Sequence, residues 1–312
     1  PFSQGRRLMW FKNLSLYRFL QPFAWTPEEL DARLAARAFR PTTELEAQFT
    51  GWVPPLGEDR PPGVHAAGGY LAFCARTEEK VMPAAAVRDA VSARVREIEQ
   101  REGRPVRGRR RAEIKDDVIF EMLPRAFTRS RVSHAWVDPG AGWLAVDAAS
   151  PRKAEEMITF LRETLETLPV IPLAVASAPH TVMTGWLTSG EIPLDFDVVD
   201  ECDLLDPGED RGTVRARRQD LGSEEIRTHL DAGKVVTQLA LTFEDRLSFV
   251  LDQRLTVKRL KFLDIVQEAA REVDAQSTAE RFDADFAVMS LELARFLPRL
   301  VDAFGGEAPR EG

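Results

Sequence analysis

The sequence has few of the residues that cross-link a fold or anchor it to a membrane. Only two of its 312 residues are cysteines, Cys74 and Cys202. A secreted protein held by disulfides would carry more, so we expect two buried thiols in a reducing cytoplasm. No apolar run approaches the roughly 18 residues of a membrane span. Residues 1–8 have no apolar stretch typical of a signal peptide, and we expect them to be non-native or an upstream extension.

Motifs that carry out chemistry are also missing. The sequence has neither a Gly-x-x-x-x-Gly-Lys phosphate loop nor a Gly-x-Gly-x-x-Gly turn. Its four histidines stand apart from one another and from the cysteines, so no spacing matches a zinc site. We therefore expect a protein that is not an enzyme and has no metal ion or other cofactor.

Two acidic clusters keep one alternative open, because carboxylates are the ligands that Mg²⁺ takes. The second cluster, Asp283 and Asp285, lies at the start of a predicted helix, where carboxylates interact favourably with the helix dipole. The first is typical of a solvated loop. A metal-dependent nuclease or DNA-processing enzyme using either cluster is the alternative prediction. The residues of the first cluster are Asp195, Asp197, Asp200, Glu201 and Asp203.

Basic residues gather in groups although the formal net charge is −8. Net charge argues mildly against a nucleic-acid partner, but the local distribution decides whether phosphates are attracted. Arginine and lysine on phosphates supply most non-specific DNA affinity, and such contacts carry no sequence information. A protein-interaction module that binds an acidic partner is a second alternative. The groups are seven basic residues within 101–115; Arg125, Arg129 and Arg131; Arg211, Arg215, Arg217 and Arg218; and Arg254, Lys258, Arg259 and Lys261.

Hydrophobic periodicity and turn residues predict an α+β fold with antiparallel or mixed sheets and packed helices. We expect an N-terminal α+β region at 9–178, with a helical and basic insertion at about 84–127. A C-terminal α+β region would follow at 179–306 and end in a long helix. Predicted strands are 14–20, 68–76, 132–136, 143–146, 169–176, 234–243 and 245–254. Predicted helices are 26–38, 83–100, 113–127, 150–168, 223–233, 259–273 and 282–304, with a turn at 51–55 and an irregular stretch at 185–219.

Eight short segments together resemble one family, the recombination-associated protein RdgC. They occur in the order found in that family and span residues 9–306. The segments are MWFKNL (9–14), GWVPP (51–55), LPRAF (123–127), KAE (153–155), QDL (219–221), AGKVVT (232–237), KRLKF (258–262) and RFDADF (281–286).

The resemblance implies a bacterial, cytoplasmic, nucleoid-associated protein that acts in DNA recombination and replication. RdgC proteins form a ring-shaped homodimer whose basic inner surface encircles double-stranded DNA. They bind with little sequence preference, restrain RecA-dependent recombination and are not known as enzymes. An acidic chain suits such a ring, because only its inner face meets DNA.

The resemblance also implies roles for particular residues. Arg125 and Phe127 match positions at the dimer contact that closes the ring. Arg218 and Gln219 match a projecting element near DNA, and Lys234 matches a basic DNA-contacting position. We expect DNA contacts also from the neighbouring basic residues Arg215, Arg217, Lys258, Arg259 and Lys261.

Overall fold

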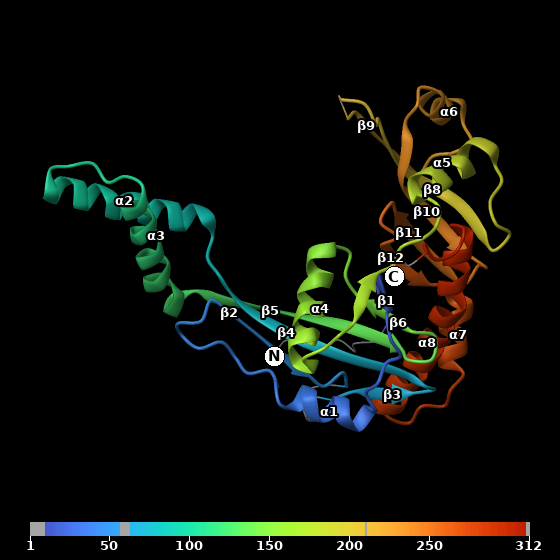
Figure 1. The fold of residues 1–312 in the computed structure, drawn as a ribbon, viewed down its shortest axis with the longest axis horizontal. Helices are drawn as coiled ribbons and strands as arrows, with labels where there is room; N and C mark the ends of the chain where they lie inside the picture. Colours follow the sequence, from blue (N-terminus) through green and yellow to red (C-terminus); the bar gives the residue numbers. More distant parts are fainter. Residues whose placement is uncertain (1–9, 57–62, 210, 310–312) are drawn as a thin grey trace. The chain divides into compact units, whose positions relative to one another are not determined.

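The fold is an α+β arrangement of helices and antiparallel sheets, as the sequence predicts. A computed structural model describes residues 10–56, 63–209 and 211–309 (Figure 1). The expected extension at 1–8 lies outside the described residues. Among the described helices, none combines the length and the apolar character needed to cross a membrane.

The first sheet has seven strands, in the order β2-β4-β5-β6-β1-β7, with β3 paired to the start of β4. Its strands are β1 (Ser15–Phe19), β2 (Gln48–Val53), β3 (His65–Ala67), β4 (Tyr70–Val81), β5 (Phe127–Asp138), β6 (Trp143–Val146) and β7 (Val170–Pro172). The strands predicted at 132–136 and 143–146 are confirmed within β5 and β6, which form an antiparallel hairpin. Its turn is closed by Asp138, whose Oδ1 accepts the Ala141 N–H at 2.9 Å.

The second sheet has five strands in the order β12-β11-β10-β8-β9. They are β8 (Phe196–Leu205), β9 (Thr213–Arg217), β10 (Val235–Phe243), β11 (Leu247–Asp252) and β12 (Val257–Phe262). The predicted pair of strands at 234–254 is confirmed as β10 and β11. Between them Glu244 and Asp245 both have positive φ, 48° and 52°. A hairpin turn with two successive residues of positive φ usually has glycine or asparagine at those positions, so this turn is locally strained.

The described helices are α1 (Pro27–Ala35), α2 (Ala84–Glu102), α3 (Arg109–Met122), α4 (Pro151–Leu165), α5 (Pro179–Ser189), α6 (Glu224–Asp231), α7 (Asp264–Arg271) and α8 (Thr278–Ala303), with a short 3₁₀ turn at Leu123–Arg125. Thr26 begins α1 as predicted. Its Oγ1 accepts the Glu29 N–H at 3.3 Å, and the Glu29 carboxylate accepts the Thr26 N–H at 3.0 Å. This reciprocal pair satisfies two backbone donors at the helix start.

The chain divides into two units, and strands β4 and β5 run from one into the other. Unit 1 contains the residues up to Leu30, Val64–Phe73 and the residues from His134 onward. Unit 2 contains Asp31–Gly63 and Cys74–Ser133. The units therefore follow different boundaries from the regions 9–178 and 179–306, which stay a prediction about how the chain is organised.

Helix α8 forms the centre of unit 1, as its long apolar face predicts. Near its start Phe282 and Phe286 pack edge-on against His65 of β3, at ring distances of 4.7 and 4.8 Å. Near its end Phe296 contacts Phe243 and Phe249 of the second sheet. One helix thus buries apolar surface against both sheets. Cys202 of β8 is buried in this unit and Cys74 of β4 in unit 2, as expected for two thiols.

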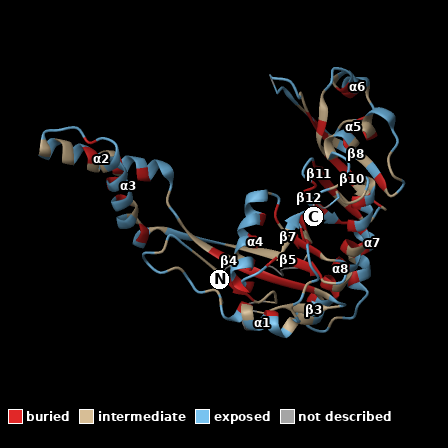
Figure 2. Cartoon of the chain, viewed as in Figure 1, coloured by how far each residue is buried: buried red, intermediate tan, exposed pale blue. Residues whose placement is uncertain are grey.

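In unit 2, helices α2 and α3 form an antiparallel hairpin with a thin core. Six buried residues hold it: Val87, Val91, Val95, Val106, Ile114 and Val118. Figure 2 shows this hairpin mostly exposed or half-buried. The helix predicted at 83–100 is confirmed as α2, and its regularly spaced valines form the buried face.

Three predicted segments have the wrong structure in whole or in part, and the helix predicted at 113–127 has the wrong bounds. Residues 51–53 belong to β2, because Gly51 lets the backbone of Phe39 pass: a Cβ at 51 would lie 2.3 Å from the Phe39 Cα. The second helix begins at Arg109 and ends at Met122, and Phe127 opens β5. The stretch 185–219 holds most of α5 and all of β8 and β9. Residues 257–262 form β12, since alternate residues Leu260 and Phe262 are buried.

Candidate nucleic-acid interface

One face of the second sheet is polar across its strands. Cross-strand partners point to the same side of a sheet. The register pairs Glu201 with Arg217, and it pairs Asp203 both with Arg215 and with Gln238. Gln238 in turn lies opposite Asp252 of β11. The alternate residues Cys202, Leu204 and Leu239 are fully buried on the other side. We call the side that carries Glu201 and Asp203 the polar face.

Ion pairs neutralise most of the cations on the polar face. Arg217 contacts Glu201 at 2.7 Å and Asp203 at 2.8 Å, and Arg215 lies 3.8 Å from Asp203. Arg259 of β12 reaches Glu201 at 2.7 Å.

Lys258 pairs with Asp252 at 2.8 Å, and Gln238 donates to Asp203 at 2.9 Å. The four cations of the polar face therefore meet three carboxylates, and one net positive charge is left. Carboxylates of the protein itself therefore neutralise most of the charge on four predicted DNA contacts, namely Arg215, Arg217, Lys258 and Arg259.

Arg218 and Gln219 lie just beyond β9, where the chain leaves the sheet. Arg218 is exposed and has a positive φ of 53°, which ends the alternation of the strand. The Gln219 N–H donates to the Asp200 carbonyl at 3.1 Å, and its side chain donates to Glu225 of α6 at 2.6 Å. The chain is thus fixed by the pairing of Arg217 with Glu201 before Arg218 and by the bonds of Gln219 after it, while the Arg218 guanidinium makes no ion pair with a described residue.

Lys234 is placed by the end of α6. Gly233 takes a φ of 89°, its N–H donates to the Leu230 carbonyl, and the Lys234 N–H donates to the His229 carbonyl. These two bonds are the Schellman arrangement, which needs a left-handed residue that glycine supplies cheaply. Lys234 is half-buried and, among the described residues, forms no ion pair. The AGKVVT segment therefore encodes a helix end that positions a lysine before β10.

The predicted DNA contacts thus fall into two sets, both in unit 1. Arg215, Arg217, Lys258 and Arg259 are ion-paired. Arg218, Lys234 and the exposed Lys261 have no ion pair within the described ranges. The sequence could not separate these sets, because Glu201 and Asp203 were predicted to lie in a solvated loop and not on a strand beside the arginines.

The carboxylates of the nuclease alternative are dispersed. Asp283 lies 3.2 Å from His65 Nε2 and is more than half exposed, whereas Asp285 is 3% exposed. Burial raises the pKa of the Asp285 carboxyl. Asp195 accepts from Arg299 of α8 at 2.5 Å, while Glu201 and Asp203 hold the polar face. Within the described ranges, no three histidine, cysteine, aspartate or glutamate side chains gather in a position to hold a metal ion.

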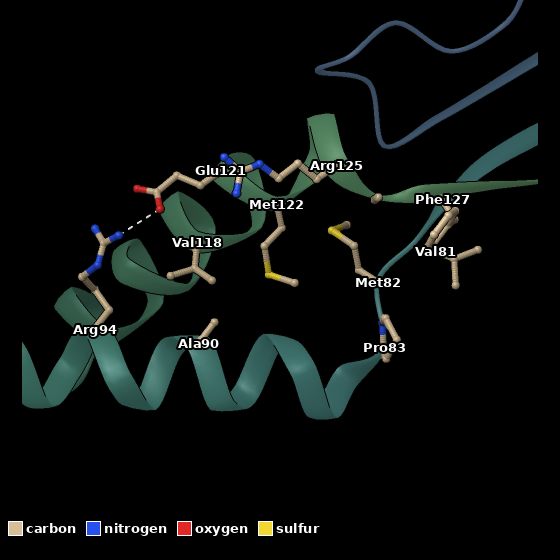
Figure 3. A pocket seen from close by; sticks show the side chains of 11 residues that line it. Val81, Met82, Pro83, Ala90, Arg94, Val118, Glu121, Met122, Arg125 and Phe127 are labelled. Carbon is tan, nitrogen blue, oxygen red and sulfur yellow. Dashed lines mark hydrogen bonds and ion pairs between the residues drawn. The ribbon is translucent and has the colours of Figure 1, made fainter.

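Arg125 and Phe127, the predicted dimer contacts, border a pocket of about 630 Å³ in unit 2 (Figure 3). Met82, Met122 and Val118 lie around the space between α2 and α3, and the Arg94–Glu121 ion pair, at 2.9 Å, marks its edge. The Phe127 residue is 87% exposed, and Val81 beside it is 42% exposed. A large aromatic ring so exposed beside a pocket with apolar walls and a charged edge is a feature of contact surfaces.

The fold and these surfaces define an acidic α+β protein with a salt-bridged polar sheet face, two cations positioned beside it, and a pocket of mixed apolar and charged lining next to an exposed phenylalanine. A family model described as "Putative exonuclease, RdgC" matches residues 9–307. The recombination-associated protein RdgC of Pseudomonas fluorescens is 46% identical over 305 residues, covering 97% of this chain and 100% of the relative.

Two further relatives carry the same name. That of Halorhodospira halophila is 46% identical over 299 residues, covering 96% of this chain and 99% of the relative. That of Aeromonas hydrophila is 41% identical over 299 residues, with the same coverage. The chain belongs to the RdgC family, which confirms the resemblance. The names of the relatives refer to recombination, and the description of the family model refers to a nuclease.

Proposed function

We propose that this protein is a non-catalytic, double-stranded DNA-binding protein that encircles DNA as a homodimer, without reading its sequence. The observation that supports DNA binding most directly is that Arg218 and Lys234, each next to a fixed backbone turn, form no ion pair with a described residue although the chain has a net charge of −8. A cation that has no carboxylate partner is directly available to a phosphate, whereas a paired cation must first give up its carboxylate.

The spacing of these two cations supports two separate phosphate contacts. Arg218 follows Arg217, which lies opposite Glu201, and Lys234 precedes Val235, which lies opposite Leu205. At about 3.3 Å per residue, the two positions are roughly 20 Å apart along β8. One phosphate cannot bridge that distance, so each residue would release its own counterions. Neither residue belongs to a helix that could enter a major groove, which favours backbone contacts over base contacts.

The homodimer part of the proposal is supported by Phe127 and the pocket beside it. Exposing a phenylalanine costs hydrophobic free energy that a contact would recover. In a twofold dimer the same surface is used twice, so Phe127 of each copy would meet the apolar wall around Met82 and Met122 of the other. A ring needs a second contact elsewhere. By occupying duplex DNA in the nucleoid, the proposed ring restrains RecA-driven recombination.

The proposed function predicts steep salt dependence. Affinity for a random duplex should fall about 10³-fold or more between 50 and 200 mM salt if about six phosphates are contacted. Two unrelated duplexes of equal length should bind within about twofold of each other, because phosphates carry no sequence. Fluorescence anisotropy at several salt concentrations measures both. Equal affinity at low and high salt would contradict the electrostatic mechanism.

Phe127→Asp should open the ring and leave the fold intact. The side chain is almost fully exposed, so the free energy of unfolding should stay within about 0.5 kcal/mol of the wild-type value. The closing contact should be lost, since a carboxylate would replace the phenyl ring that packs against the apolar side chains of Met82 and Met122. Retention on nicked circular plasmid after a high-salt challenge measures closure, with linear DNA of equal length as the control. Equal retention of the variant and the wild type would argue against this contact.

The nuclease alternative is kept by the description of the family model. It requires metal-dependent nicking of supercoiled plasmid, or degradation of linear duplex from its ends, that Asp283→Asn abolishes. Our proposal requires that neither occurs with Mg²⁺ or Mn²⁺. The third possibility, an acidic protein partner, requires that the wild type fails to shift random duplex at moderate salt.

A further inference from the structure

The tip of the α2–α3 hairpin in unit 2 is the most basic short segment of the chain. We define the hairpin tip as Arg101–Arg111, which contains six arginines and one carboxylate, Glu102. The proposed DNA contacts Arg218 and Lys234 belong to unit 1, so the hairpin tip is not among the residues that the proposed function assigns to DNA. The segment lies between the helices predicted at 83–100 and 113–127, but Arg109–Arg111 form the first turn of α3.

Carboxylates cannot neutralise this tip. Glu102 alone serves three arginines: Arg110 at 2.5 Å, Arg104 at 3.3 Å and Arg101 at 4.0 Å. Arg109 pairs with Glu113, one turn along α3, at 3.1 Å.

The other two arginines of the tip have no such partner. Arg107 and Arg111 are exposed and make no ion pair with the part of the chain that the structure describes. At least four positive charges of the tip therefore lack a carboxylate of their own.

The charges lie where they destabilise the hairpin. Arg109, Arg110 and Arg111 occupy the first turn of α3, which has no acidic residue and no side-chain cap at Gly108. The start of a helix carries a partial positive charge, so cations there are unfavourable. Arg111 and Lys115, four residues apart on the same helix, repel each other as well.

The tip is nevertheless held in a defined shape. The Glu99 carboxylate accepts the Val106 N–H at 2.8 Å, and Val106 is buried in the hairpin core. Gly103 ends α2 with a φ of 67°, and its N–H donates to the Glu99 carbonyl. The exposed arginines are therefore presented from a folded turn. Folding alone gives no reason to keep them, whereas a bound polyanion would neutralise them.

We propose that the hairpin tip is a second phosphate-binding surface for double-stranded DNA, separate from Arg218 and Lys234. This inference rests on the proposed DNA-binding function and extends it to unit 2. Its chemistry is counterion release: each arginine that meets a phosphate frees condensed cations, so the tip adds to the salt dependence of binding. A ligand that binds only the folded tip also stabilises it.

The test is the full-length variant Arg104→Ala/Arg107→Ala/Arg111→Ala, which leaves Arg110 on Glu102. We expect its affinity for a random duplex at about 0.1 M salt to fall at least tenfold, and its log–log salt slope to drop by about 1 to 3. Without DNA, its unfolding midpoint should equal or exceed that of the wild type, because repulsive charges are removed. A purely structural role would lower the midpoint.

The matched control is Arg88→Ala/Arg152→Ala/Arg271→Ala. It removes three exposed cations and changes the net charge equally, and it should bind within about twofold of wild type because charge is removed outside the surface. If the tip variant lost no more affinity for the duplex than this control, the inference would be overturned. The proposed function would still be supported by Arg218 and Lys234.

Two other results are informative. If the tip variant lost affinity for the duplex while an Arg218→Ala/Lys234→Ala variant bound it fully, DNA binding by the hairpin tip would be supported. The proposed contacts of Arg218 and Lys234 in unit 1 would then be rejected. Unchanged duplex binding with lost binding of a polyglutamate peptide would assign the tip to an acidic protein and overturn the inference.

Discussion

Replacing Arg218 and Lys234 together by alanine is expected to weaken binding to every duplex about 60-fold at 0.1 M salt. The magnitude follows from a loss of about 0.9 in the log–log salt slope for each phosphate contact, hence about 1.8 for two. All sequences should lose affinity alike, because phosphates are the same in each. Anisotropy titrations over a range of salt concentrations give both the affinity and the slope.

The control for this variant removes two cations that lie elsewhere. Arg88→Ala/Arg152→Ala changes the net charge by the same amount, and Arg152 already pairs with Glu156 at 3.2 Å on α4. Its salt slope should stay at the wild-type value. A loss confined to one sequence, or an equal loss in the control, would show that Arg218 and Lys234 do not act as local phosphate contacts.

Arg246→Ala is expected to lower the free energy of unfolding by about 3 kcal/mol. Arg246 ends the strained turn between β10 and β11 and forms a bidentate pair with Glu292 of α8, whose side chain is 7% exposed; its Nε lies 2.8 Å from Glu292 Oε2. Removing the arginine leaves the buried carboxylate without its partner. Urea unfolding followed by far-UV circular dichroism measures the change.

Two further variants separate the cause. Arg246→Met/Glu292→Leu should recover most of the stability, since no unpaired charge is left buried. Arg152→Ala breaks the exposed pair with Glu156 and should cost about 0.5 kcal/mol or less. If Arg246→Ala were as mild as Arg152→Ala, the pair would not hold the turn to α8.

The strained turn illustrates what periodicity can and cannot predict. Alternation identified β10 and β11 as partners, because side chains on one side of each strand are apolar. Nothing local explains why Glu244 and Asp245 adopt positive φ. Their conformation is supported from 46 or more residues away: Arg295 of α8 pairs with Glu244 at 2.6 Å, as Glu292 does with Arg246. Such support depends on the packing of α8, which no local pattern contains.

The sequence likewise predicted only part of the candidate interface. The basic groups and the positions of Arg218, Gln219 and Lys234 were named from the sequence and the resemblance. That Gly233 closes α6 with a left-handed turn follows from its residue type. The division between paired and unpaired cations did not, because the stretch 185–219 was expected to be irregular. Only when β8 and β9 pair do Glu201 and Asp203 meet Arg217.

By itself, the sequence determined the α+β class, the long terminal helix, the family and the gathering of basic residues, since these depend on periodicity, turn residues and composition. The tertiary structure decided which of those basic residues keep a charge available to an outside partner. Charge is a property of single residues, whereas neutralisation requires a carboxylate within about 4 Å. Strand register supplies that carboxylate to Arg217 and withholds it from Arg218, its neighbour in the chain.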